Sequence, residues 1–228
     1  YSCLDNIDID EFFIHLKKQT DFHNEVTYNN YIHQSIKLNK QSTSSLKVPF
    51  IKAYSQDIII QEWCSGYHYN QFIDKYPQFK LKSKIIAAKS FLELLYIHKI
   101  IHMDCHNGNI IFNINKEGNI ITSFVDFGLA NFISLQDLDI ISNFIKAINE
   151  KSSILLFSTI YLCCNTSKNT NIKIDTLFNK EEISKFFDLK KNKEAFTFIK
   201  DILNKINNKD IKINNNILYI LIKLSLIL

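Results

Sequence analysis

Residues 101–112 read IHMDCHNGNIIF, and residues 123–128 read SFVDFG. The first segment contains the pattern H-x-D-x-x-x-x-N, which ends at Asn109, and the second ends in D-F-G, which begins at Asp126. Short triplets recur by chance, but these parts follow one another in order around predicted elements. They fall after a long apolar-striped segment, at the start of one β-like run and at the end of another. The ordered combination therefore carries more information than any of its parts.

The segment between the two motifs predicts a β-hairpin. Residues 109–114 and 119–125 are short β-like runs, and Lys116-Glu117-Gly118 lies between them as a turn. A hairpin fixed by this turn returns the chain on itself, so that Asp126 faces Asn109 across 17 positions of sequence. We therefore expect both side chains to face one cleft.

The residue types at these positions suit the transfer of a phosphoryl group. Such a transfer needs its charge neutralised and its acceptor positioned. Mg²⁺ prefers oxygen ligands, which a carboxylate at Asp126 and an amide oxygen at Asn109 would supply. A second carboxylate at Asp104 would lie near the acceptor hydroxyl, as a general base or as an orienting group. The order of these residues is typical of the kinase superfamily.

The two histidines of this loop are given different roles. His102 is placed in the catalytic loop with Asp104, and we expect it to pack and hydrogen-bond beneath the D-F-G turn rather than to transfer protons. For His106 two roles stay open, which are shaping of the loop and contact with a substrate. A zinc site made of His102, Asp104 and His106 is disfavoured, because their spacing would require a strand and no second ligand cluster is apparent.

Upstream, residues 58–66 read IIIQEWCSG, an apolar strand that runs into a short linker. We expect this linker to bind the adenine of a nucleotide. Gln61 would lie near the back of the pocket, and Glu62, Trp63 and Cys64 would offer backbone hydrogen bonds. The alternative is a core strand that ends in a turn.

Glu25 lies on a helix that the apolar spacing predicts over residues 22–36, with Asp21 or Thr20 near its N-cap. We expect Glu25 to be the glutamate that holds a lysine at the nucleotide site. Taken alone, it would be read as a solvated surface charge.

The remaining pattern predicts an α+β fold whose second half is helical. The strongest helix is expected over residues 81–100, because apolar residues recur at intervals of three and four. These apolar residues are Leu81, Ile85, Ala88, Leu92 and Leu95. Ser134 begins a capping box for a helix to about residue 149. The other expected elements are a hairpin of residues 48–54 and 58–63, and helices near residues 8–18, 69–76, 152–162, 180–187, 194–206 and 216–227.

Composition limits the compartment and the partners. The 228 residues are 46% hydrophobic and 22% charged, which is enough for a folded core. All 27 basic residues are lysines and the net charge is only +4, so no nucleic-acid partner is expected. Five cysteines without a C-x-x-C pair indicate an intracellular, reducing compartment, either cytoplasmic or organellar.

No secretory signal is expected, because no charged segment followed by an apolar one opens the chain. Residues 217–228 form the longest apolar stretch, which is too short to span a bilayer. We expect a terminal core helix there, and a truncated membrane anchor is the alternative.

Together these motifs resemble those of the UbiB/AarF-type atypical kinase-like family, which is associated with coenzyme Q biosynthesis and related lipid metabolism. That family has a helix reading E/Q-x-D-[FLY]-x-x-E-x-x-N, a V-P pair before a strand, a hinge reading L-x-M-E-[YF]-x-x-G, a loop reading H-A-D-P-H-P-G-N, and D-F-G. The hinge differs here in having Gln in place of Met, and the loop has three substitutions. The matching segments are residues 19–28, 48–49, 59–66, 102–109 and 126–128.

The resemblance implies a protein-kinase-like fold, mostly the helical C-lobe with a partial N-lobe. Residues 1–64 would form the partial N-lobe, and residues 65–228 would form the C-lobe with the catalytic and metal loops. It implies Asp104 as the catalytic aspartate, and Asn109 and Asp126 as Mg²⁺ ligands. The expected activity is ATP-dependent phosphotransfer or ATP hydrolysis. The acceptor is expected to be small or lipid-linked rather than a protein, and membrane association is left open.

The chain also departs from the family. The alanine-rich nucleotide loop, the K-x-G-Q element and the site lysine should precede Asp21, where no such strand or loop is found. We expect a fragment that begins within a domain, with a natural truncation or a pseudokinase as the alternative. No A-P-E follows Asp126, and five residues separate Gly128 from Ser134, which disfavours a protein substrate.

Three alternatives to this interpretation stay open. One is a small-molecule phosphotransferase of the aminoglycoside or choline kinase type, which also uses H-x-D-x-x-x-x-N. Another is a non-catalytic scaffold. The third is a module that binds a membrane surface or a partner through the lysines of residues 190–212.

Overall fold

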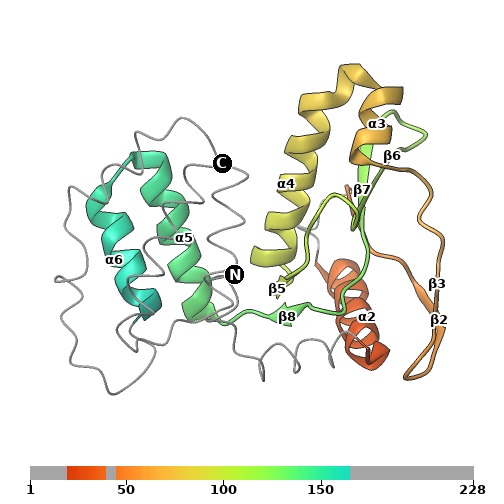
Figure 1. Cartoon of the computed structure of the whole chain (residues 1–228), viewed down its shortest axis with the longest axis horizontal. Helices are drawn as coiled ribbons and strands as arrows, with labels where there is room; N and C mark the ends of the chain where they lie inside the picture. The colour runs from red at the N-terminus through yellow and green to blue at the C-terminus, as the bar shows by residue number, and fades with distance from the viewer. Residues whose placement is uncertain (1–19, 40–44, 165–228) are drawn as a thin grey trace, which may run out of the picture. The chain divides into compact units, whose positions relative to one another are not determined.

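The computed structural model describes residues 20–39 and 45–164 (Figure 1). The chain divides after Ile133 into two compact units, and each is described by itself. The second unit contains α5 (Leu135–Glu150) and α6 (Ser153–Cys164). The elements of the first unit are α2 (Phe22–Leu38), β1 (Leu46–Lys47), β2 (Ile51–Tyr54), β3 (Ile59–Gln61), β4 (Tyr67–His68), α3 (Tyr69–Lys75), η1 (Pro77–Phe79), α4 (Lys80–Tyr96), β5 (Ile100–Ile101), β6 (Ile110–Ile114), β7 (Ile120–Phe124) and β8 (Asn131–Phe132).

Two parts of the prediction are not tested by these elements. The helices expected near residues 8–18, 180–187, 194–206 and 216–227 lie outside the described residues. The boundary expected between residues 64 and 65 stays a prediction, and the division into two compact units falls elsewhere, after Ile133.

Helix α2 begins at Phe22, directly after the predicted N-cap residue Asp21. The side chain of Asp21 accepts a hydrogen bond from the amide of His23 at 3.0 Å, which satisfies one of the unpaired donors at the helix N-terminus. The amide of Phe22 donates to the carbonyl of Gln56 at 3.2 Å, so the turn of the β2–β3 hairpin holds the same end of the helix. The N-cap predicted at residue 20 or 21 is confirmed.

The hairpin between the two motifs is present as predicted. Strands β6 and β7 pair antiparallel from Ile110 with Phe124 to Ile114 with Ile120. Gly118 closes the turn with a positive φ of 79°, and its amide donates to the carbonyl of Asn115 at 3.0 Å. The hairpin forms the middle of a four-stranded sheet with the order β1-β7-β6-β4, in which β1 runs parallel to β7. The hairpin predicted at residues 48–63 also forms, as the separate two-stranded sheet β2–β3.

The predicted buried face of the long helix is wrong in its N-terminal half. Helix α4 leaves Leu81 70% exposed and Ile85 46% exposed, although Leu95 is fully buried. The face that packs on β7 instead carries small polar residues, and the Oγ of Ser90 lies 2.7 Å from the Oγ1 of Thr122 in a buried hydrogen bond. A short serine lets the helix approach the sheet closely while the buried hydroxyls satisfy each other. The helix also ends at Tyr96 rather than at residue 100, because the chain turns there into β5.

The second unit is a helix pair. Ser134 caps α5 by accepting the amide of Asp137 at 3.1 Å, as the capping box predicts. Helix α5 turns its apolar face to α6 across a short connection that contains Lys151 in the left-handed conformation, with φ 49°. Among the helices of residues 20–39 and 45–164, none is both long and apolar enough to cross a membrane.

Substitution of Gly66 tests the packing of the chain between β3 and β4. Gly66 has a φ of 145°, and a Cβ added there would collide with the carbonyl oxygen of Phe112. Gly66→Ala is therefore expected to lower the free energy of unfolding by about 2–3 kcal/mol, measured by urea denaturation. Gly118→Ala is the matched control, because its φ is also positive but nothing lies within 4 Å of the added Cβ, so its loss should be only about 1 kcal/mol. Equal losses in the two variants would contradict the close approach.

Candidate functional site

The loop between β5 and β6 is closed by its own hydrogen bonds. The amide of Asn109 donates to the carbonyl of His106 at 2.9 Å, and the amide of His106 donates to the carbonyl of Asp104 at 3.0 Å. The side-chain Nδ2 of Asn109 donates to the carbonyl of Asp104 at 3.1 Å and lies 3.4 Å from its Oδ2. Because the amide nitrogen is held by Asp104, the amide oxygen of Asn109 faces away from it and can bind a cation.

His106 shapes this loop. Its Nδ1 accepts the amide of Gly108 at 3.0 Å, and its Nε2 lies 3.6 Å from Oδ2 of Asp104. A Cβ on Gly108 would lie 2.8 Å from the ring of His106, so a larger residue there would displace the ring from its bond to the Gly108 amide. Of the two roles left open for His106, the geometry supports loop shaping. The ring is also 53% exposed, and contact with a substrate stays untested.

His102 lies beneath the D-F-G turn, as predicted. Its side chain is buried, its Nε2 donates to the carbonyl of Val125 at 3.0 Å, and its ring centroid lies 4.9 Å from that of Phe127. Burial lowers the pKa of His102, against opposing contributions from Val125 and from the Asp126 and Asp104 carboxylates. A neutral, enclosed ring that donates to the backbone is a positioning residue for the turn.

The D-F-G turn brings Asp126 beside Asn109. The amide of Val125 donates to the carbonyl of Asn109 at 3.1 Å, so the residue before Asp126 is bonded to the residue that opens β6. Asp126 itself has a φ of 63°, the left-handed conformation that costs a non-glycine residue roughly 1 kcal/mol or more. This conformation leaves the Asp126 side chain exposed while Phe127 is fully buried.

Glu25 is a buried group and not a solvated surface charge. It is 6% exposed, and its carboxylate accepts a hydrogen bond from the amide of Phe127. Burial and, to a lesser extent, the nearby Asp126 carboxylate together raise the pKa of Glu25 from 4.5 to about 7, against a smaller opposing contribution from the Phe127 amide. Within the described residues no lysine forms an ion pair with Glu25, so its pairing with a lysine stays a prediction.

The linker after β3 is anchored to the β6–β7 hairpin. The thiol of Cys64 is hydrogen-bonded with Ser123, and burial raises its pKa. The Oγ of Ser65 accepts from Nδ2 of Asn113 at 3.2 Å. Together with the close approach of Gly66 to the carbonyl of Phe112, these contacts fix the linker against the sheet that carries the site.

The residues expected to bind adenine lie at the start of this linker. The amide of Glu62 donates to the carbonyl of Phe50 at 2.8 Å, which extends the β2–β3 ladder and makes that amide unavailable to a base. The carbonyl of Glu62 and the amides of the linker residues after it would then be the groups that hydrogen-bond to adenine. Trp63 is 86% exposed, and Gln61 turns its Oε1 into the interior, where it has no partner among the described residues. The binding of adenine by these residues stays a prediction.

Sequence reasoning missed two polar features of α2. Asn29 is fully buried one turn after Glu25, and neither its Oδ1 nor its Nδ2 has a partner within residues 20–39 and 45–164. Its spacing of four from Glu25 places both on one helix face, which was the available signal. Ser35 bonds to His98, 63 residues further along the chain, and no local pattern announces such a contact.

The donor set fits a hard cation such as Mg²⁺. Asp126 offers an exposed carboxylate and Asn109 an amide oxygen, which are ligands that Mg²⁺ binds together with water and phosphate oxygens. Among the described residues, no three His, Cys, Asp or Glu side chains gather as a metal site.

The fold and the loops together define a kinase-like protein. A family model described as the ABC1 atypical kinase-like domain matches residues 4–155, and the chain belongs to this family. This confirms the resemblance to the UbiB/AarF type and the α+β, kinase-like fold.

The comparison with solved structures supports the same fold. The chain is similar to the Rv3197 protein of Mycobacterium tuberculosis, solved in complex with erythromycin, with a TM-score of 0.56 and 16% sequence identity. That similarity covers 99% of this chain and 58% of the Rv3197 chain, so the chain spans little more than half the length of that protein. No curated protein sequence matches the chain.

Replacement of Glu25 tests its burial beside Asp126. Between pH 4.5 and about 7 the folded state retains a proton on Glu25 that the unfolded state has released. The stability that this proton confers is therefore full below pH 4.5, falls as the pH rises and is lost above about 7. Glu25→Gln keeps an acceptor for Phe127 without the charge, so its melting temperature should exceed that of the wild type clearly at pH 8 and little at pH 5, in buffer with EDTA.

Glu117→Gln, in the exposed hairpin turn, is the control for this experiment. A difference between Glu25→Gln and wild type that is the same at pH 5 and pH 8 would contradict the burial of a titrating carboxyl at this position.

Proposed function

We propose that this chain carries the catalytic and metal loops of a Mg-ATP-dependent phosphotransferase or ATPase of the UbiB/AarF type. The observation that carries the proposal is that both backbone groups of Val125 are hydrogen-bonded to the catalytic loop. Its amide is bonded to Asn109 and its carbonyl to His102, so the catalytic loop and the D-F-G turn form one unit. Asp104 and Asn109 of the loop and Asp126 of the turn would then act at one site, with the chemistry that phosphoryl transfer needs.

Asp126 and Asn109 would hold the Mg²⁺ of a bound nucleotide. When bound, this ion neutralises charge on the phosphate oxygens. The role of the protein is to present the two oxygen donors without rearrangement, which the bonds of Asn109 to Asp104 and of Val125 to Asn109 support.

Asp104 would orient the acceptor hydroxyl and accept its hydrogen bond. The side chain of Asp104 is 35% exposed, so it is accessible to a substrate. Its Oδ2 lies close to Nδ2 of Asn109 and to Nε2 of His106. The other carboxylate oxygen, Oδ1, is thus the one available to an acceptor.

We infer a small or lipid-linked acceptor, in a reducing intracellular compartment, and a connection to quinone or lipid metabolism. The short interval between the D-F-G turn and α5 supports the first of these, because it leaves no room for a peptide-binding segment. The compartment is supported by Cys64 and Cys105, neither of which forms a disulfide. The metabolic connection rests on family membership.

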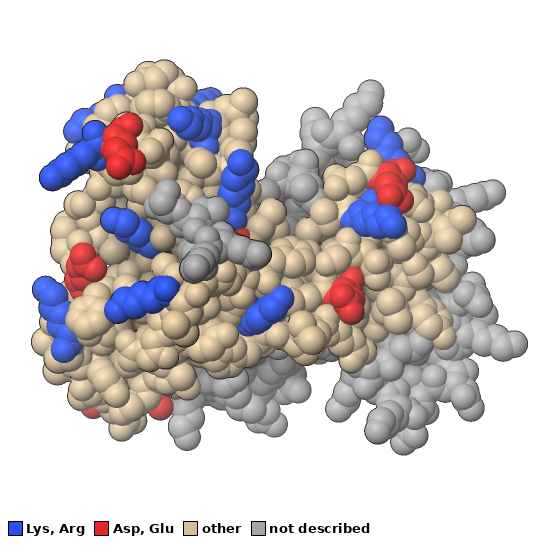
Figure 2. All heavy atoms as spheres, turned by 180° about the vertical axis from the view of Figure 1, so that it is seen from behind, with Lys and Arg blue, Asp and Glu red and all other residues tan. Residues whose placement is uncertain are grey.

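The alternatives differ in what they require of the site. A phosphotransferase of the aminoglycoside or choline kinase type would use the same loops with another acceptor, and a scaffold would bind without turnover. The lysines that a surface-binding module would use lie outside the described residues. On the face that Figure 2 shows, the lysines of the described residues are dispersed among uncharged side chains.

Asp126→Asn tests the metal assignment. The substitution removes the charged ligand, so the Mg²⁺-dependent part of nucleotide affinity should fall by roughly a hundredfold, about 2.7 kcal/mol. The measurement is the thermal shift with ATP in the presence of Mg²⁺ or EDTA, on this chain and on the natural full-length polypeptide. Asp74→Asn, on the exposed surface of α3, is the matched control and should behave as wild type. Unchanged Mg²⁺-dependent binding by Asp126→Asn would remove this residue from the metal site.

Asp104→Asn tests the catalytic assignment. The substituted side chain keeps the shape of the loop, so Mg-ATP binding should stay within about twofold of wild type while turnover falls by roughly 10²–10³-fold. Release of ADP, with and without candidate acceptors, measures turnover and separates transfer from hydrolysis. Retained turnover would exclude Asp104 from catalysis, and binding without turnover in the wild type would favour a scaffold.

A further inference from the structure

Three polar side chains, the half-buried Ser35 and the buried His98 and Glu93, connect α2 to the end of α4. The Oγ of Ser35 lies 2.7 Å from Nδ1 of His98, and Nε2 of His98 lies 3.5 Å from Oε1 of Glu93. His98 is fully buried and Glu93 is 4% exposed. Nδ1 of His98 and the hydroxyl of Ser35 are hydrogen-bonded to each other, whereas Nε2 approaches Glu93 without hydrogen-bond geometry.

The order Ser-His-Glu is that of a hydrolytic triad, but this arrangement is enclosed. His98 has no exposed surface through which a substrate or water could reach it. Ser35 lies within α2 and points its hydroxyl at the ring. A triad needs an accessible general base and donors for an oxyanion, and His98 is not accessible. What the three side chains do in the fold is to connect α2 with the end of α4.

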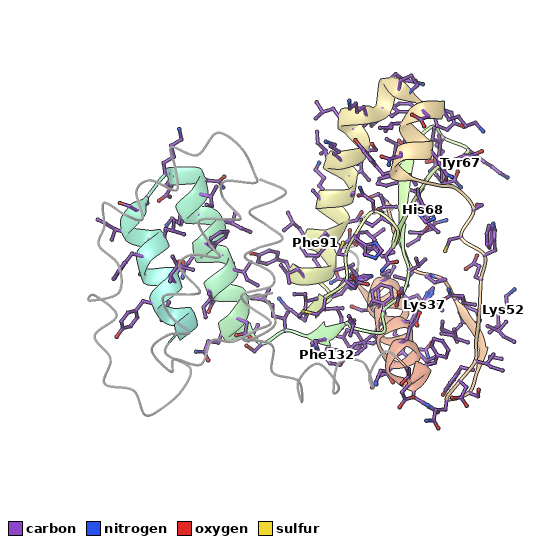
Figure 3. The ribbon with its side chains drawn as sticks, viewed as in Figure 1. Lys37, Lys52, Tyr67, His68, Phe91 and Phe132 are labelled. Carbon is purple, nitrogen blue, oxygen red and sulfur yellow. The ribbon has the colours of Figure 1, made fainter. Side chains whose placement is uncertain are left out.

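The elements held are those that border the site. His98 follows α4 directly and precedes β5, the strand that leads into the catalytic loop. Strand β5 pairs with β8, which follows the D-F-G turn. Helix α2 contacts β8 through the hydroxyl of Tyr28, which donates to Asn131 at 3.3 Å, and through Tyr31, whose ring meets that of Phe132 edge-on at 4.9 Å. Figure 3 labels Phe132 on β8.

Helix α2 depends on such polar contacts because its apolar packing is thin. Its buried residues are Glu25, Val26, Asn29 and Ile32, of which only two are apolar. The carboxylate of Glu25 accepts the amide of Phe127 at one end of the helix, and Ser35 is held by His98 about 15 Å away along the axis. Because a helix is stiff, fixing α2 at Ser35 also limits the movement of Glu25 near its other end.

We propose that Ser35 and His98, backed by Glu93, are positioning residues that fix α2 and thereby hold Glu25 against the D-F-G turn. Their effect on the contact between Glu25 and Phe127 follows from the structure alone. Their effect on turnover rests on the proposed function.

The test compares single variants by hydrogen exchange of backbone amides, followed by NMR. Ser35→Ala should raise the exchange rate of the Phe127 amide by roughly tenfold, because the Glu25 end of the helix is no longer held. Ser35→Thr keeps the hydroxyl and should restore protection. Thr27→Ala, on the exposed face of the same helix, is the control, since its hydroxyl donates only to the carbonyl of His23 at 2.7 Å. The amide of Ile121 in the β6–β7 hairpin should exchange as in wild type in every variant.

The outcomes separate this inference from the proposed function. Wild-type exchange at Phe127 in Ser35→Ala, or an equal rise in Thr27→Ala, would overturn the positioning role even if the protein turns over ATP. Faster exchange at Phe127 without nucleotide binding by the wild type would support positioning and contradict the proposed function. If Ser35→Ala does not fold, Ser35→Val, which also removes the hydroxyl, replaces it, and unchanged exchange in that variant would equally overturn the inference.

In the natural full-length polypeptide, Ser35→Ala should lower kcat for ATP severalfold with little change in KM, and Ser35→Thr should recover it. A loss that Ser35→Thr does not recover would contradict a role for the hydroxyl.

Discussion

The candidate site depends on the backbone of Val125. Its amide and carbonyl are bonded in opposite directions, to Asn109 and to His102, and these two residues are the ends of the catalytic loop. The next residue, Asp126, can stay in a left-handed conformation because its neighbour is held on both sides and Phe127 is buried. The strained backbone of Asp126 therefore places its exposed carboxylate at a defined position.

The electrostatics of the site follow from the same turn. Glu25 is buried, and its loss of hydration together with the charge of the nearby, exposed Asp126 carboxylate favours the protonated form of Glu25. A cation held by Asp126 would offset this repulsion. Under the proposed function, metal binding and the position of α2 are therefore coupled, because Glu25, whose carboxylate interacts with that of Asp126, lies on α2.

Local features of the fold could be predicted from the sequence, and distant pairings could not. The caps at Asp21 and Ser134 and the β6–β7 hairpin depend on neighbouring residues, and the structure has them as expected. The apolar stripe of α4 predicted the wrong buried face for the N-terminal half of that helix. The face that packs on β7 instead carries Ser90, which bonds to Thr122. The motifs located the catalytic loop and the D-F-G turn, but the burial of Glu25 and the bond of Ser35 to His98 arise from elements that meet only in the folded chain.

The two sides of the site are held by different kinds of contact. The hairpin and the linker are joined by ladder hydrogen bonds and by the close approach of Gly66 to Phe112, which leave little freedom. Helix α2 carries the opposite carboxylate on only two buried apolar side chains and a few polar bonds. Any adjustment of the site to a ligand is therefore borne by α2 rather than by the hairpin, and the bond between Ser35 and His98 limits how far that adjustment goes.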